Sequence, residues 1–168
     1  MSLSPKTSQM NHSSIPALSV KEIKEGLQQA ALSERKRHAK VLHSPGDEFN
    51  SVFNFLRSGT YMQPHLHPGE EKIEQIYLVE GKLRMVFFND VGEISKTVIL
   101  EKGGEELISV PAFSWHTYEV LSDSAVTYET MMGVYDPKTW KEFASWAPVE
   151  GSEVAPAYVA SLKDQAIG

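Results

Sequence analysis

Residues 59–81 carry the strongest signal in the sequence and read Gly-Thr-Tyr-Met-Gln-Pro-His-Leu-His-Pro-Gly-Glu-Glu-Lys-Ile-Glu-Gln-Ile-Tyr-Leu-Val-Glu-Gly. Two of these residues, His65 and His67, would project from the same face of a β-strand, because side chains alternate along a strand. Glu74 follows and opens an apolar run that a glycine closes, and His116 stands at the start of another predicted strand. Three imidazoles and one carboxylate that converge inside a β-barrel would form a transition-metal site.

The carboxylate of this site has three candidates: Glu74, and also Glu70 and Glu71, which are nearer to His67 but fall in a Pro-Gly loop. Glu74 is preferred, because it lies inside the predicted strand, where a carboxylate on an otherwise apolar face needs a partner. Such donors suit Fe, Mn, Co, Ni or Zn and would leave up to two open positions in an octahedron. The alternative is a set of unrelated structural histidines, which is our interpretation of His12, His38 and His43.

Composition excludes several classes of function. The chain of 168 residues has 16 Lys and Arg against 22 Asp and Glu, which gives a net charge of −6 and argues against a nucleic-acid partner. There is no cysteine, so disulfides, thiolate metal sites and cysteine nucleophiles are excluded. No segment has the apolar length of a signal sequence or a membrane helix, so we expect a cytoplasmic protein without a membrane partner.

The pattern of the chain predicts an all-β domain with two short flanking helices. Residues 1–16 are expected to be a disordered tail and residues 17–168 a single domain, whose barrel spans about 38–132. Short strands with period-two alternation and turn residues between them indicate an antiparallel jelly roll. The predicted strands are 38–43, 50–57, 60–67, 74–79, 82–88, 93–100, 106–110, 115–121 and 124–132. Ser19 and Glu22 form a capping box for a helix near 19–33, and Asp136 with Pro137 predicts a second helix near 137–145.

Alternation along the His65 strand also predicts the lining of a pocket. Tyr61 and Gln63 would share the inner face with the histidines and bind substrate, whereas Met62 and Leu66 would face outward. That apolar outer face suggests a homodimer. Further candidates come from other strands: Tyr118 or Glu129 for proton transfer, and Arg57 or Arg84 to bind a carboxylate or phosphate.

These motifs resemble those of the cupins. Residues 59–81 look like the first cupin motif and residues 103–116 like the second. Within cupins, the chain resembles the WbuC family of metalloproteins, on the segments Pro64–Pro68, Val79–Gly81, Phe88–Asp90 with Gly92, Trp115–His116 and, above all, Trp146-Ala147-Pro148-Val149-Glu150-Gly151. Three positions depart from the cupin pattern: the spacing from His67 to Glu74 is longer than usual, Phe113 replaces a glycine, and Val120 replaces an asparagine.

The resemblance implies a cupin fold, a divalent metal and a relation to surface-polysaccharide synthesis. The leading hypothesis is a metal-binding cupin that acts on a small polar molecule, a sugar or a sugar nucleotide, as an isomerase or epimerase. The alternative is a non-catalytic module that binds a sugar or metabolite, in which the metal is structural or absent. A third is a storage or scaffold-like barrel, with jelly-roll subunits paired through a hydrophobic face.

Overall fold

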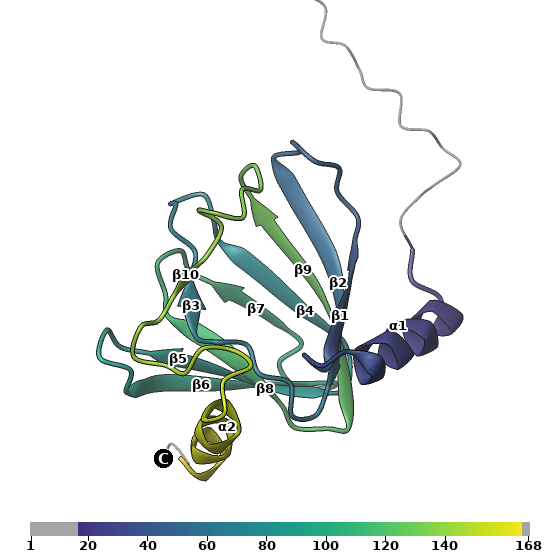
Figure 1. Cartoon of the computed structure of the whole chain (residues 1–168). Coiled ribbons are helices and arrows are strands. Elements are labelled where there is room, and N and C mark those ends of the chain that lie inside the picture. The colour runs from purple at the N-terminus through teal and green to yellow at the C-terminus, as the bar shows by residue number, and fades with distance from the viewer. Residues whose placement is uncertain (1–16, 166–168) are drawn as a thin grey trace, which may run out of the picture.

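Two five-stranded antiparallel sheets face each other in the computed structural model, which describes residues 17–165 (Figure 1). The first sheet has the order β1 (Arg37–Val41), β2 (Phe49–Arg57), β9 (Ser124–Met132), β4 (Glu74–Glu80) and β7 (Leu107–Val110). The second has the order β10 (Glu142–Phe143), β3 (His65–Leu66), β8 (His116–Val120), β5 (Lys82–Phe88) and β6 (Ile94–Glu101). The predicted all-β jelly roll is confirmed. The predicted tail, residues 1–16, lies outside the described residues.

The space between the sheets is apolar at one end and polar at the other. On β2, Asn54 lines a cavity, whereas Leu56, two residues on, is fully buried in the apolar core. On β8, Tyr118 lines the cavity and Val120 is in the core. Strands β4 and β9 show the same division, so the barrel has one closed, hydrophobic end and one end that opens into a cavity with polar groups in its lining.

Helix α1 (Val20–Leu32) packs on the outer face of the first sheet, beside β1 and β2 (Figure 1). It begins with the predicted capping box, since the Ser19 hydroxyl accepts a hydrogen bond from the Glu22 amide and the Glu22 carboxylate accepts one from the Ser19 amide. Its buried residues, Gly26 and Ala30, lie against Phe55. Among residues 17–165, no helix is both long and apolar enough to cross a membrane.

The prediction of a second helix near 137–145 is wrong. Asp136 does accept hydrogen bonds from the amides of Lys138 and Thr139, but these form only a turn. The chain then extends into β10, which pairs with β3. Two tryptophans of this segment contact different parts of the barrel: Trp140 packs beside His67, whereas Trp146 packs on β5. The C-terminal helix is α2 (Ala155–Asp164) instead, which contacts the outer face of the second sheet through Leu162.

The predicted strand 60–67 is reduced to His65–Leu66. Side chains replace strand pairing before it: Arg37 donates to the carbonyl of Tyr61, and Thr117 donates to that of Met62. Alternation therefore does not hold from residue 60 to residue 64. Met62 lines the cavity and Leu66 is buried, so the predicted apolar outer face does not exist.

The packing of α1 on the sheet predicts that Gly26→Ala destabilises the protein, although alanine is the better helix former. A Cβ atom at position 26 would lie 2.5 Å from the ring of Phe55, which is buried. Gly26→Ala should therefore lower the free energy of unfolding by about 1–3 kcal/mol, as overpacked cores do, although alanine in an exposed helix would raise it. Urea denaturation measures the change. In a Phe55→Leu background the penalty should shrink; an equal penalty in both backgrounds would contradict this packing.

Candidate metal centre and the cavity beside it

Three histidines and one glutamate from both sheets meet at the polar end of the barrel. His65 lies on β3 directly opposite His116 at the start of β8, and His67 follows β3. Glu74 begins β4 in the other sheet and reaches toward them. One ligand atom from each of the four residues lies within 4.8 Å of the others. The structure thus brings together the four residues predicted as metal ligands; Glu70 and Glu71 are outside this group.

Each imidazole is oriented by a backbone carbonyl. The Nδ1 atom of His65 lies 3.0 Å from the oxygen of Gln63, and that of His116 lies 2.8 Å from the oxygen of Ser114. The Nδ1 atom of His67 lies 2.8 Å from the oxygen of Trp140. A carbonyl only accepts hydrogen bonds, so each Nδ1 carries the proton. Every Nε2 atom is left free to act as a ligand, which is the usual arrangement around metal-binding histidines.

The polar atoms inside the cluster lack enough protons to satisfy one another. The Glu74 Oε2 atom lies 3.2 Å from Nε2 of His116 and 3.4 Å from Nε2 of His67. If Nδ1 is protonated in both rings, a hydrogen bond to Glu74 would require a charged imidazolium. The Nε2 atom of His67 is buried and has no hydrogen-bond partner. A divalent cation would satisfy all four groups at once, so the donor set fits a metal.

Burial acts in opposite directions on the two kinds of ligand. It lowers the pKa of His65 well below the usual range, which keeps the ring neutral and able to bind a cation. For Glu74, burial by itself would raise the pKa, but the neighbouring rings of His116 and His67 outweigh it and leave the pKa well below its usual range. A neutral His65 and an ionised Glu74 are the forms in which these groups bind a cation.

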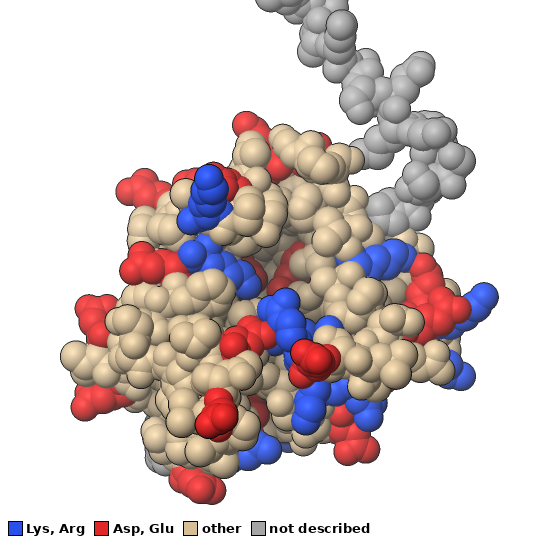
Figure 2. Space-filling view, in the orientation of Figure 1, with Lys and Arg blue, Asp and Glu red and all other residues tan. Residues whose placement is uncertain are grey.

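A cavity of about 760 Å³ opens beside the cluster and is lined by residues of both sheets. In Figure 2 the face toward the viewer is hollowed near its centre, with lysine and arginine side chains around the hollow. Its polar lining includes Tyr118, Glu129 and Lys141. Burial raises the pKa of Tyr118 above its usual range, so its hydroxyl remains a proton donor in hydrogen bonds. Burial, together with the charge of Glu74, raises the pKa of Glu129 to about 7.

The structure separates the other predicted site residues. Tyr118 and Glu129 line the cavity. Tyr61 and Gln63 do not: the Tyr61 hydroxyl donates to the carbonyl of Pro148, and the Gln63 amide donates to that of Ala144. Both instead tie the C-terminal segment to the barrel. The predicted inner face was wrong here because residues 60–64 are not a strand.

Neither arginine predicted to bind an anion lines the cavity. Arg57 and Asn54 lie three residues apart on β2, so their side chains project from opposite faces of the strand. Because Asn54 lines the cavity, Arg57 points away from it. Arg84 pairs with Glu119 at 2.6 Å and donates to the carbonyl of Leu162, on the side of the second sheet that α2 covers. Arg84 thus anchors the C-terminal helix.

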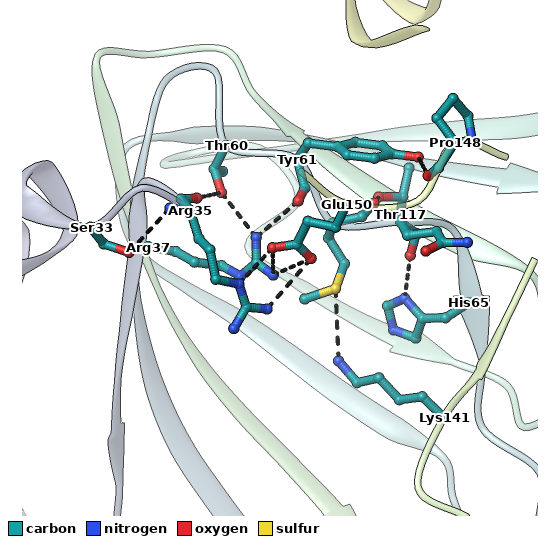
Figure 3. Close-up of polar contacts among 12 residues, drawn as sticks. Ser33, Arg35, Arg37, Thr60, Tyr61, His65, Thr117, Lys141, Pro148 and Glu150 are labelled. Carbon is teal, nitrogen blue, oxygen red and sulfur yellow. Dashed lines mark hydrogen bonds and ion pairs between the residues drawn. The ribbon is translucent and has the colours of Figure 1, made fainter. Parts of the chain in front are cut away.

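Sequence reasoning missed three charged residues that line the cavity. Arg35 and Arg37 line it and share the carboxylate of Glu150 (Figure 3). Lys141 lines it from the residue before β10. The sequence held a partial signal, since the basic run 35–37 and the segment 146–151 both stand out, but no local pattern indicates that they meet.

The ion pairs of Glu150 predict a pH-dependent contribution to stability. Arg37 donates to both Glu150 oxygens at 2.6 Å, and Arg35 donates at 2.5 Å. Burial would raise the pKa of Glu150, but these hydrogen bonds lower it below the ordinary 4.5. Glu150→Gln should therefore cost about 1–3 kcal/mol at neutral pH.

The cost should depend on pH in one direction. Because the carboxyl pKa is lower in the folded state, its stabilisation is fully present above pH 4.5 and is lost as the pH falls through the folded value. Thermal unfolding over this range measures the difference between the two proteins, which should shrink in acid. Glu153→Gln, at an exposed position three residues along, is the control and should have little effect. A cost of Glu150→Gln that is independent of pH would contradict the pairing.

The comparisons with known proteins agree on the fold and give no function. Residues 18–100 match the model of a family described as a domain of unknown function, DUF6016. No curated protein matches the chain. Solved structures of DMSP lyases are similar, at 16% identity over 66% of this chain and 53% of that chain, with a TM-score of 0.51.

Oxalate decarboxylases are similar to about the same degree. The enzyme from Lactobacillus farciminis is 15% identical over 62% of this chain and 30% of its own, with a TM-score of 0.50. A second oxalate decarboxylase structure is 21% identical over 62% of this chain and 27% of its own, also at 0.50. The chain spans less than a third of these proteins, and such identities show the fold alone. Together with the two facing sheets and the histidine cluster between them, they show that this chain has the cupin fold.

Proposed function

We propose that this protein binds a divalent transition metal through His65, His67, Glu74 and His116 and acts on a small polar molecule bound in the adjacent cavity. One observation carries the proposal. All three Nδ1–H groups are directed at carbonyls, so three Nε2 atoms and an ionised carboxylate face one point without enough protons to bond one another. Imidazole and carboxylate ligands suit Fe, Mn, Ni or Zn.

The cavity supports proton-transfer chemistry. When bound, the metal would supply a Lewis acid that polarises a carbonyl or hydroxyl oxygen. Glu129, with a pKa of about 7, can both accept and return a proton near neutral pH. Tyr118 keeps its proton and can donate a hydrogen bond to an oxygen of the substrate. These roles fit an isomerase or epimerase, in which a proton leaves a carbon next to a carbonyl and is returned.

A sugar or sugar nucleotide is the substrate class that we propose. A volume of about 760 Å³ is within the range of small-molecule sites, and the resemblance to WbuC proteins suggests surface-polysaccharide synthesis. A non-catalytic module would bind the same molecules and leave them unchanged. The two functions therefore differ in turnover and share the binding site.

Metal analysis tests the centre. Wild-type protein purified without added metal should contain about one transition-metal ion per chain by mass spectrometry. His65→Ala and His67→Ala should lose it, because removing a ligand costs more than the roughly 10–100-fold in affinity that loss of an outer hydrogen-bond partner costs. His43→Ala is the matched control, since the ring of His43 hydrogen-bonds to the backbone of Ser51 and is not in the four-residue cluster.

Stoichiometric metal in both alanine variants would contradict the proposed ligands. The variants should keep cooperative unfolding, because a domain of this size has a core of its own. Loss of cooperative unfolding together with the metal would show that the metal is structural.

Deuterium exchange tests the proton-transfer role. Metal-loaded protein incubated in deuterated water with keto-sugars, sugar acids and sugar nucleotides should exchange a carbon-bound proton, which proton NMR detects as a lost signal. Glu129→Gln should lower the exchange rate by about 100-fold or more, as removal of a general base typically does, and keep its metal. Binding without any exchange would indicate the non-catalytic module instead.

We also propose a homodimer, on the resemblance to cupins. The apolar face of Met62 and Leu66 no longer supports it, since Met62 lines the cavity and Leu66 is buried. Sedimentation at micromolar concentration decides between dimer and monomer.

A further inference from the structure

Lys141 is held in a fixed place beside the metal ligands. The preceding residue, Trp140, accepts the hydrogen bond of His67 through its carbonyl. The two following residues are β10, in which Glu142 pairs with Leu66 and Phe143 with His65. The backbone on both sides of Lys141 is therefore attached to the segment that carries two of the four candidate ligands. Its ammonium group is placed by the same contacts that place the histidines.

The ammonium of Lys141 extends into the cavity without an anionic partner. In Figure 3 it is directed toward a sulfur atom. The sulfur of Met62 lies 3.9 Å from the Lys141 Nζ atom. Within residues 17–165, that sulfur is its one polar contact, and no carboxylate lies within ion-pair distance of it. Burial lowers the pKa of this amine. A desolvated ammonium without a partner is unfavourable, and a bound anion would relieve that cost.

The other cations of the cavity, Arg35 and Arg37, already have a carboxylate partner within the protein. Arg35 and Arg37 share the carboxylate of Glu150, and Arg37 also donates to Thr60 and to the carbonyl of Tyr61. The guanidinium of Arg37 is thus largely used within the protein, and Arg35 is paired with the same carboxylate. Among the described residues, Lys141 is the lysine or arginine of the cavity lining that has no carboxylate partner.

The charges of the site favour an anionic ligand when the metal is bound. A divalent ion with one carboxylate ligand, Glu74, leaves a positive centre, and Lys141 adds a second positive charge. The Arg35, Arg37 and Glu150 group is positive as a whole. Against these charges stands the one carboxyl group of Glu129. The cavity therefore has a net positive charge.

We propose that Lys141 binds the carboxylate of an anionic substrate, a sugar acid or a related hydroxy- or keto-acid, whose other oxygens approach the metal. This specifies the substrate class of the proposed function and rests on it. A carboxylate is favoured over a phosphate, because a single ammonium matches a single negative charge and the arginines that would bind a doubly charged group are occupied by Glu150.

A matched pair of sugars tests the inference. Glucuronate and glucose share a ring and differ in a carboxylate, and calorimetric titration into zinc-loaded protein compares their affinities. Glucuronate should bind the wild type at least about tenfold more tightly than glucose, as one charged hydrogen bond provides. Lys141→Met should remove most of that difference, and Lys141→Arg should retain it. Lys138→Met removes a charge from the same segment at an exposed position and should leave the difference unchanged.

The metal content of each variant separates the two proposals. Lys141→Met should bind as much zinc as the wild type, because Lys141 is not among the clustered ligands. If the wild type binds no metal but glucuronate still depends on Lys141, the proposed function is wrong and the anion site stands. If metal binds and glucuronate shows no preference over glucose, or the preference survives in Lys141→Met, the anion site is wrong.

Discussion

A single carboxylate joins the two sheets at the open end of the barrel. At the other end, apolar side chains from both sheets hold the sandwich together without directional contacts. At the open end, Glu74 reaches from the first sheet to His67 and His116 of the second. A buried carboxylate between the sheets is tolerated only with partners, and a divalent cation shared with the histidines, whose other nitrogens are bound to carbonyls, would be such a partner. The position of the cavity and the orientation of its lining depend on this arrangement.

The C-terminal segment completes the site and is more than an appendage of the barrel. Residues 140–143 supply the carbonyl that orients His67, the strand that covers β3, and the ammonium of Lys141. Further on, Glu150 occupies Arg35 and Arg37. Two kinds of cation therefore line one cavity. Arg35 and Arg37 bind the protein's own carboxylate, and Lys141 can bind the carboxylate of a ligand. This division allows the segment to be anchored by charge without neutralising the whole cavity.

Local patterns were sufficient to predict the barrel and the four candidate ligands. Capping at Ser19, the strands from 74 to 132 and the spacing of the histidines depend on neighbours in sequence, and the structure confirms the elements. Asp136 with Pro137 was misleading, because the same residues that begin a helix also suit a turn. Tertiary contacts decided between them, since the residues that follow complete the edge of β3.

The lining of the cavity was harder to predict, because it depends on contacts between distant segments. Arg37 and Glu150 are 113 residues apart in sequence. The prediction that Tyr61 and Gln63 line the cavity was wrong for a different reason, because side chains alternate between two faces only in a strand. At Tyr61 and Met62 the backbone carbonyls bond to the side chains of Arg37 and Thr117 in place of a neighbouring strand. The face on which a side chain lies can therefore be predicted from alternation only where the strand is continuously paired.

The hydrogen bond from His67 to the Trp140 carbonyl couples two equilibria. One is binding of a cation by the ring, and the other is attachment of residues 140–143 to β3. Because thermodynamic coupling is reciprocal, whatever detaches this segment also weakens the cation site, and an ion in the site tightens the segment. Residues 140–143, which form one wall of the cavity, and the cation site would then open and close as one cooperative unit.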